Sequence, residues 1–136
     1  MTQLADSVRQ IGSLLDARDW TSLRALLSDE FVDHSAPPGA PAGPDGYVAT
    51  LRWVTEQLGI TYQVEDVVAD GNTAALRATA SGVDEHGGFG FPATGKPFSM
   101  ATMHWYRGGE HGLTEHWGVL DQLGMLTQIG AVPPPH

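Results

Sequence analysis

The hydrophobic period of the chain changes once, near Gly59 and Ile60, and this change restricts the fold more than any other feature of the sequence. Up to that point apolar residues recur every three or four positions, which is typical of helices with one buried face. Beyond it apolar and polar residues alternate, which is typical of half-buried strands. Helices followed by strands predict an α+β domain, in which the helices pack on a curved antiparallel sheet. We expect a cone-shaped cup with a pocket open at one end.

Three helices are predicted before the change of period. The first spans Met1 to Leu15, and Asp19 can cap a second, short helix that begins at Trp20. Pro44 suits the first turn of a third helix, because a proline there loses no hydrogen bond. The apolar face of this third helix consists of Tyr47, Leu51, Val54 and Leu58.

A short irregular segment is predicted between the second and third helices. Phe31 and Val32 indicate a brief extended piece, which leads into His34 and a loop with four prolines between positions 37 and 44. Proline fixes its own backbone and cannot donate a hydrogen bond, so this loop is expected to be stiff and irregular.

About four antiparallel strands are predicted after the change of period. Asp70, Gly71 and Asn72 indicate a hairpin turn, since glycine and asparagine accept the positive φ that such turns need. One face of the third strand carries Phe98, Met100, Thr102, His104 and Tyr106. The strands are expected at residues 61–68, 73–81, 98–107 and 113–120, with a glycine-rich loop at 84–97, a helical turn at 122–129 and a proline-rich tail at 131–136. Residues 1–130 are thus predicted to form a single domain.

Composition excludes several classes of function. The chain carries 16 acidic against 7 basic residues, a formal charge of −9, which argues against nucleic acid and membrane surfaces as partners. It has no cysteine, so disulfides, thiolate zinc sites and cysteine nucleophiles are excluded. The N-terminal segment lacks the features of a secretory signal, and we expect a cytoplasmic protein. The partner expected for the pocket is a small, largely apolar organic molecule.

Two long segments carry a resemblance to a known family. They are FPATGKPFSMATMHWYRGG at 91–109 and LTEHWGVLDQLGMLTQIG at 113–130, supported by Asp33 and His34 and by GPDGYVATL in the third helix. With these motifs the sequence resembles the SnoaL-like polyketide cyclases, which belong to the nuclear-transport-factor-2-like superfamily. The resemblance implies a cyclase that closes a ring in a polyketide-like ester by intramolecular aldol condensation, without a cofactor.

The resemblance also implies roles for individual residues. Asp121 matches the acid/base carboxylate of the family, and His104 matches a histidine that donates a hydrogen bond to the carbonyl side of the substrate. Burial in an apolar cup would make such a carboxylate more basic, because a low-dielectric surrounding disfavours its charged form. The residues expected to bind substrate are His34, Trp53, Met100, His116 and Trp117.

Other interpretations of the same residues stay open at this point. Asp121 could instead cap the helical turn that follows it, and His104 could be an ordinary core histidine. His116 falls on the opposite face from Glu115 and Trp117 if the last strand is regular. The spacing of His111, Glu115 and His116 matches no helical zinc motif.

Two other functions and one assembly follow from the same features. Arg107 and Asp121 could form part of an epoxide-opening site, as in limonene-epoxide-hydrolase-like members of the superfamily, or the pocket could bind an apolar metabolite without catalysis. The outer face of the third strand carries Ser99, Ala101, Met103 and Trp105. Met103 and Trp105 would be unfavourable in water, so we expect a homodimer through this face.

Overall fold

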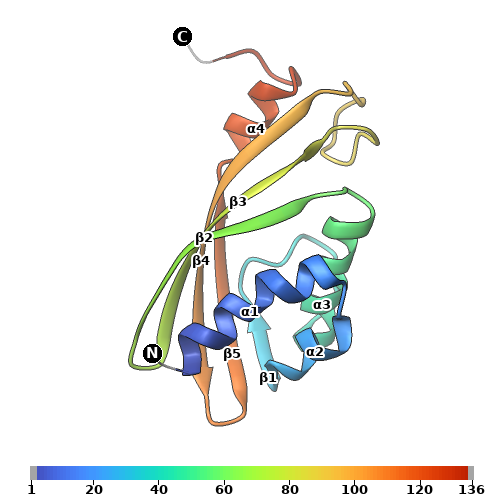
Figure 1. Cartoon of the computed structure of the whole chain (residues 1–136). Helices are drawn as coiled ribbons and strands as arrows, with labels where there is room; N and C mark the ends of the chain where they lie inside the picture. Colours follow the sequence, from blue (N-terminus) through green and yellow to red (C-terminus); the bar gives the residue numbers. More distant parts are fainter. Residues whose placement is uncertain (1–2, 135–136) are drawn as a thin grey trace.

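A computed structural model describes residues 3–134 and shows helices packed on one side of a curved, open sheet of five strands (Figure 1). The helices are α1 (Gln3–Ala17), α2 (Trp20–Ala25), α3 (Gly43–Glu56) and α4 (Gln122–Gln128). The strands are β1 (Leu27–Asp33), β2 (Thr61–Asp70), β3 (Thr73–Val83), β4 (Pro97–Gly109) and β5 (Gly112–Leu120). The α+β fold, the three N-terminal helices and the antiparallel meander are therefore confirmed.

Local sequence accounts for the ends of these elements. The Asp19 side chain accepts a hydrogen bond from the Ser22 backbone N–H at 3.1 Å, which caps α2 as predicted. Pro44 lies in the first turn of α3, where its missing N–H costs nothing. Gly71 has a φ of +60° in the turn between β2 and β3, a conformation that glycine adopts without strain.

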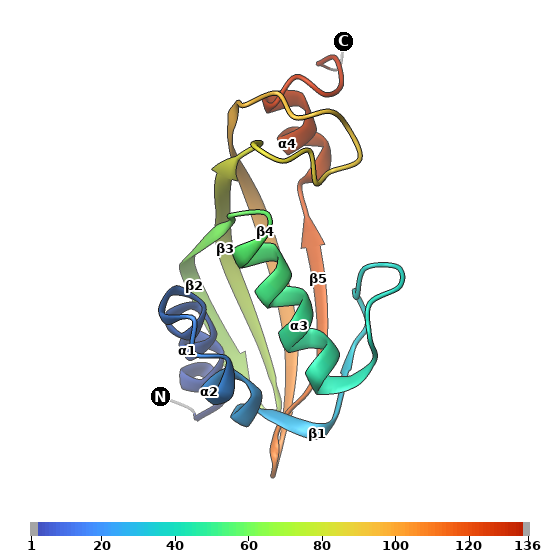
Figure 2. The ribbon, with the colours of Figure 1, turned by 90° about the vertical axis from the view of Figure 1, so that its right-hand side faces the viewer.

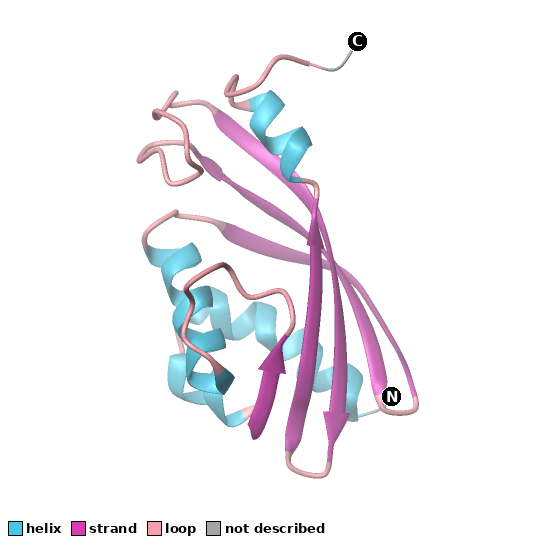
Figure 3. Cartoon of the chain, turned by 180° about the vertical axis from the view of Figure 1, so that it is seen from behind, coloured by secondary structure: helices cyan, strands magenta, loops and turns pink. Residues whose placement is uncertain are grey.

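The sheet contains one strand beyond the predicted meander. Its order is β1-β5-β4-β3-β2, in which β1 runs parallel to β5 and every other pair is antiparallel. The extended piece expected at Phe31 and Val32 is part of this β1, which begins at Leu27. Figure 3 shows β1 as a short strand beside the long β5. A parallel edge strand needs a long connection, and here α3 and the three following strands supply it.

Two apolar clusters hold the helices against the inner face of the sheet. The larger one joins α1, α2 and α3 to the sheet around Val8, Leu23, Phe31 and Leu113, which are all almost fully buried. The smaller one lies where α4 meets the far end of β4, around Phe98, Met100, Met125 and Ile129. Figure 2 shows α3 lying across the inner face between these two regions.

No helix within residues 3–134 is long and apolar enough to cross a membrane.

Candidate active site

A cavity of about 160 Å³ lies between the inner face of the sheet and helices α1 and α3. Apolar side chains form most of its wall, among them Ile11 of α1, Leu51 of α3 and Val64 of β2. Pro37 and Leu120, both solvent-exposed, also line it and therefore mark its mouth. An apolar cavity of about 150 Å³ accommodates benzene, so this one has room for roughly one six-membered ring.

A chain of hydrogen-bonded polar side chains crosses one wall of the cavity. The Asp33 carboxylate Oδ1 lies 2.7 Å from His116 Nδ1, and His116 Nε2 lies 2.9 Å from His104 Nδ1. The chain ends where His104 Nε2 meets the Thr102 hydroxyl at 3.1 Å. Asp33 and His116 are more than nine-tenths buried, with side-chain exposures of 8% and 7%.

Strand pairing brings Asp33, His116 and His104 together. Asp33 at the end of β1 is the register partner of His116 on β5, and His104 on β4 is the register partner of Gly118. A side chain at Gly118 would begin only 3.1 Å from the nearest atoms of both histidine rings, so glycine leaves the space in which these rings meet. The Gly118 backbone N–H also donates to the Ser35 hydroxyl, which ties the proline-rich loop to β5.

The direction of each hydrogen bond in this chain can be deduced by starting from Thr102. Thr102 has one hydroxyl hydrogen and donates it to the Ala78 carbonyl oxygen at 2.9 Å, so Thr102 can only accept from His104. His104 Nε2 therefore carries a hydrogen, and the Nδ1 of a neutral His104 accepts from His116 Nε2. The distance of 2.7 Å between His116 Nδ1 and Asp33 Oδ1 is that of a hydrogen bond, so one further proton lies between these two atoms.

Burial and the hydrogen-bond partners of Asp33 and His104 set the protonation states of these two residues. Burial raises the pKa of Asp33, but the hydrogen bond and positive charge of His116 and the Ser35 N–H outweigh it and hold that pKa below its usual value. Burial, together with the positive charge of His116, lowers the pKa of His104 to about 4. The resting wall accordingly contains an Asp33 carboxylate and a neutral His104, and His116 donates a hydrogen bond to each of them.

One oxygen of Asp33 remains available to a ligand. Oδ1 accepts from His116 and from the Ser35 backbone N–H at 3.0 Å, whereas no residue in the described range 3–134 donates to Oδ2. The only fully buried side-chain oxygen or nitrogen without a partner in that range is Asp84 Oδ1, so Asp33 Oδ2 is open to solvent or substrate. Because Asp33 also lines the cavity, its Oδ2 can accept a proton from a bound molecule.

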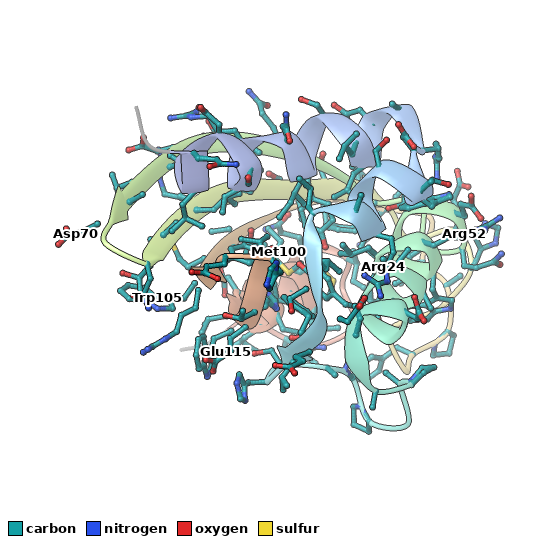
Figure 4. All side chains as sticks on the ribbon, turned by 90° about the horizontal axis from the view of Figure 1, so that it is seen from below. Arg24, Arg52, Asp70, Met100, Trp105 and Glu115 are labelled. Atoms are coloured by element: carbon teal, nitrogen blue, oxygen red, sulfur yellow. The ribbon has the colours of Figure 1, made fainter. Side chains whose placement is uncertain are left out.

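The structure brings only two of the sequence-predicted site residues into the cavity, His104 and His116. Met100 is buried in the smaller apolar cluster, and Trp53 is 45% exposed beside the proline-rich loop. His34 and Trp117 lie on the outer side of the sheet, where their rings stack with centroids 4.5 Å apart. Figure 4 shows the label of Met100 near the centre of the view, while Trp105 and Glu115 lie at the periphery.

Asp121 caps α4 and does not line the cavity. Its exposed carboxylate accepts a hydrogen bond from the Gly124 backbone N–H at 3.0 Å, so the structure shows the capping role that the sequence left open as the alternative. The Asp–Arg combination considered for epoxide opening is not assembled either, because the Arg107 guanidinium lies over the Trp117 ring, at 5.6 Å from its centre, on the outer side of the sheet. Among residues 3–134 no group of His, Asp or Glu side chains is arranged to hold a metal ion.

No role was predicted for Asp33 or for the tyrosines Tyr47, Tyr62 and Tyr106, which all line the cavity. The tyrosines could have been found from periodicity, because Tyr106 shares a strand face with His104 and Tyr47 belongs to the apolar face of α3. Asp33 could not have been found in this way, because only the pairing of β1 with β5 places it beside His116.

Comparisons with known proteins agree with this architecture. The sequence model of the SnoaL-like polyketide cyclase family matches residues 5–129. The aklanonic acid methyl ester cyclase DauD of Streptomyces sp. (strain C5) is 24% identical over 134 residues, which are 96% of this chain and 83% of DauD. DnrD of Streptomyces peucetius, a cyclase of the same name, is also 24% identical, over 96% of this chain and 92% of its own.

The fold comparison gives the same result. The crystal structure of IdmH from Streptomyces antibioticus superposes with a TM-score of 0.81 at 28% identity, and the match covers 95% of this chain and 99% of IdmH. The family model matches almost the whole length of the chain, and the fold is shared with a solved structure. The chain belongs to the SnoaL-like polyketide cyclase family.

Proposed function

We propose that this protein closes a ring in a small polyketide-like ester by intramolecular aldol condensation, with Asp33 as the acid/base group. The observation that carries the proposal is the chain Asp33–His116–His104–Thr102, which is set into the wall of an otherwise apolar cavity. A site that only bound an apolar metabolite would have no need of a buried carboxylate with a chain of polar partners, because burying polar and charged groups is costly.

The proposed reaction is balanced without any other reactant. Asp33 Oδ2 takes a proton from the carbon between two carbonyl groups, which leaves an enolate. The enolate carbon attacks a second carbonyl carbon of the same molecule, a carbon–carbon bond forms, and the attacked oxygen becomes an alkoxide. Asp33 then returns the proton to that oxygen. A positioned acid/base group contributes roughly 10²–10⁴-fold to the rate of such a step.

His116 and His104 act on this reaction through Asp33. The hydrogen bond from His116 Nδ1 holds the carboxylate in place through Oδ1 and leaves Oδ2 free for the substrate. His104 and Thr102 fix the orientation of His116, since the hydrogen bonds from His116 Nε2 to His104, from His104 to Thr102 and from Thr102 to the Ala78 carbonyl each have one possible direction. We therefore treat both histidines as positioning residues.

The charge in the cavity favours an uncharged substrate. No lysine or arginine is among the described residues that line it, and the Asp33 carboxylate would repel a free carboxylate group. An ester avoids that repulsion, and DauD and DnrD are named for a methyl ester. A substrate larger than one ring would extend past Pro37 and Leu120 at the mouth.

The expectation of a cytoplasmic protein stays a prediction.

The test combines two readouts on purified protein. Aklanonic acid methyl ester is the first probe, followed by chromatography for the cyclised isomer, and solvent-deuterium exchange into methyl acetoacetate is the second, which reports proton abstraction alone. We expect Asp33→Asn to lower both rates by about 10²–10⁴-fold, because asparagine keeps the acceptor for His116 but cannot take a proton. Wild-type rates in Asp33→Asn, or a wild type that accelerates neither process, would refute the proposal.

A further inference from the structure

All three tyrosines of the chain line the cavity that holds Asp33. Two of them, Tyr47 of α3 and Tyr106 of β4, are buried and bring their hydroxyl oxygens to 2.6 Å from each other. Their rings pack on His116, with centroid distances of 5.1 Å for Tyr47 and 4.8 Å for Tyr106. The proposed acid/base mechanism assigns these hydroxyl groups no role.

Counting hydrogens shows that this pair has one donor to spare. Each hydroxyl carries a single hydrogen, and one of the two hydrogens forms the bond between the oxygens. Within residues 3–134 neither hydroxyl has another hydrogen-bond partner, so the second hydrogen is available inside the cavity. A buried donor without an acceptor is unfavourable by about 1–3 kcal/mol, which an oxygen of a bound molecule would relieve.

Both hydroxyls remain protonated donors at any ordinary pH. Burial and the neighbouring Tyr106 raise the pKa of Tyr47 well above its usual value, and burial likewise raises the pKa of Tyr106. The Asp33 carboxylate is close enough to raise both pKa values further. The pair is therefore near the group that would take the proton, yet does not compete with it as a base.

We propose that the Tyr47–Tyr106 hydroxyl pair is the oxyanion donor of this site, which stabilises first the enolate oxygen and then the alkoxide. This inference rests on the proposed ring closure and adds the group that receives the negative charge. Two hydroxyls in series suit that task, because each bond in a hydrogen-bonded chain polarises the next as charge develops at its end. The buried surrounding strengthens the interaction further, since no water competes for the oxyanion.

The test measures binding of an oxyanion, so it does not depend on turnover. The probe is 4-nitrophenol, whose anion differs in absorbance from the neutral form, and 4-nitroanisole is its uncharged analogue. Asp33→Asn serves as the background, because an amide reproduces the neutral state of Asp33 after it has taken a proton. In this background we expect the protein to prefer 4-nitrophenolate over 4-nitroanisole. The double substitution Tyr47→Phe with Tyr106→Phe should reduce that preference by about 10- to 100-fold.

The single substitutions sharpen the result. Tyr47→Phe or Tyr106→Phe leaves one hydroxyl that can turn toward the probe. Each single substitution should therefore change the logarithm of the affinity ratio between the two probes by much less than half as much as the double substitution does. Tyr62→Phe is the matched control, because it removes a hydroxyl from the same cavity without touching the pair. A purely structural role would weaken binding of both probes equally and leave their ratio unchanged.

The outcomes separate the two proposals. An unchanged preference in the double variant, no preference for the anion at all, or an equal loss in Tyr62→Phe would each overturn the oxyanion assignment, whatever the ring-closure assay gives. A preference that depends on the pair, together with full ring closure in Asp33→Asn, would keep the donor and reject Asp33 as the base.

Discussion

At the scale of single residues, His104 makes the folded protein sensitive to acid. Its ordinary pKa is 6.5, and burial, assisted by the positive charge of His116, lowers the pKa of the folded protein to about 4. Between these two pH values the unfolded chain binds more protons than the folded one, so stability falls as the pH falls through this window. From pH 7 to pH 5 the loss should be about 2 kcal/mol in the free energy of unfolding.

Urea denaturation of the wild type and of His104→Gln at the two pH values checks this prediction. The lowered pKa of Asp33 also makes the free energy of unfolding fall with pH, but at lower pH, because the contribution of Asp33 is lost only as its carboxylate becomes protonated. The glutamine variant should therefore be less stable at neutral pH yet lose much less stability on acidification. An equal loss in both proteins would contradict a neutral, buried His104.

Alternation along the late strands predicted part of this residue network. It placed His104 and Tyr106 on one face of a strand, and it placed His116 opposite Glu115 and Trp117, as the structure shows. It could not predict Asp33, whose partner His116 is 83 positions away in the sequence. Such a contact depends on which strands pair, and a short segment around Phe31 carries no signal for its partner.

At the scale of elements, α4 closes the far end of the sheet, and Asp121 determines where this helix begins. The Asp121 carboxylate caps the helix, while Met125 and Ile129 pack against Phe98 and Met100 in the smaller apolar cluster. The resemblance to the family assigned catalysis to Asp121, and that assignment stays a prediction. Its position outside the cavity gives a direct experiment that distinguishes the two roles.

Substitution of Asp121 should change stability and leave the reaction intact. Asp121→Ala removes the acceptor for the Gly124 N–H and should lower the free energy of unfolding by about 1 kcal/mol, whereas asparagine caps a helix as well as aspartate does. Thermal unfolding and the ring-closure assay on both variants provide the measurement. A loss of turnover in Asp121→Asn of 10²-fold or more would instead establish Asp121 as the acid/base group.

Among the elements, β1 is the one that the sequence underestimated. Its apolar residues Leu27 and Phe31 are separated by polar ones without strict alternation, so the segment indicated only a short extended piece. Its register with β5 also shifts between Leu27 and Val32, which interrupts the regular pattern further. The remaining strands are nine or more residues long, and their bounds were predicted to within a few positions.

At the scale of the whole molecule, the outer face of the sheet carries several exposed apolar side chains. In Figure 1 helices α1, α2 and α3 lie on one side of the sheet, and α4 lies at its upper end. The outer face carries Met103, 54% exposed, and Val119, 72% exposed, which are register partners on β4 and β5. Beside them Trp105 is paired with Trp117. Contiguous apolar surface of this kind is typical of interfaces between proteins.

We expect two copies of the chain to associate through this face, and light scattering at micromolar concentration should give the mass of a dimer. Replacing Met103 and Val119 together by glutamate should give monomers, because carboxylates would face one another across the interface without a partner. Leu123→Glu is the matched control: Leu123 is 59% exposed, but it lies on α4, away from the outer face.

Salt provides a second, independent check of this assembly. Each copy carries a formal charge of −9, so the two copies repel each other, and screening by added salt should tighten the dimer. An interface held together by ion pairs would respond in the opposite direction. A monomer mass for the wild type at micromolar concentration would contradict the prediction, as would a dimer that survives the double glutamate substitution, because in that case the copies associate through another surface.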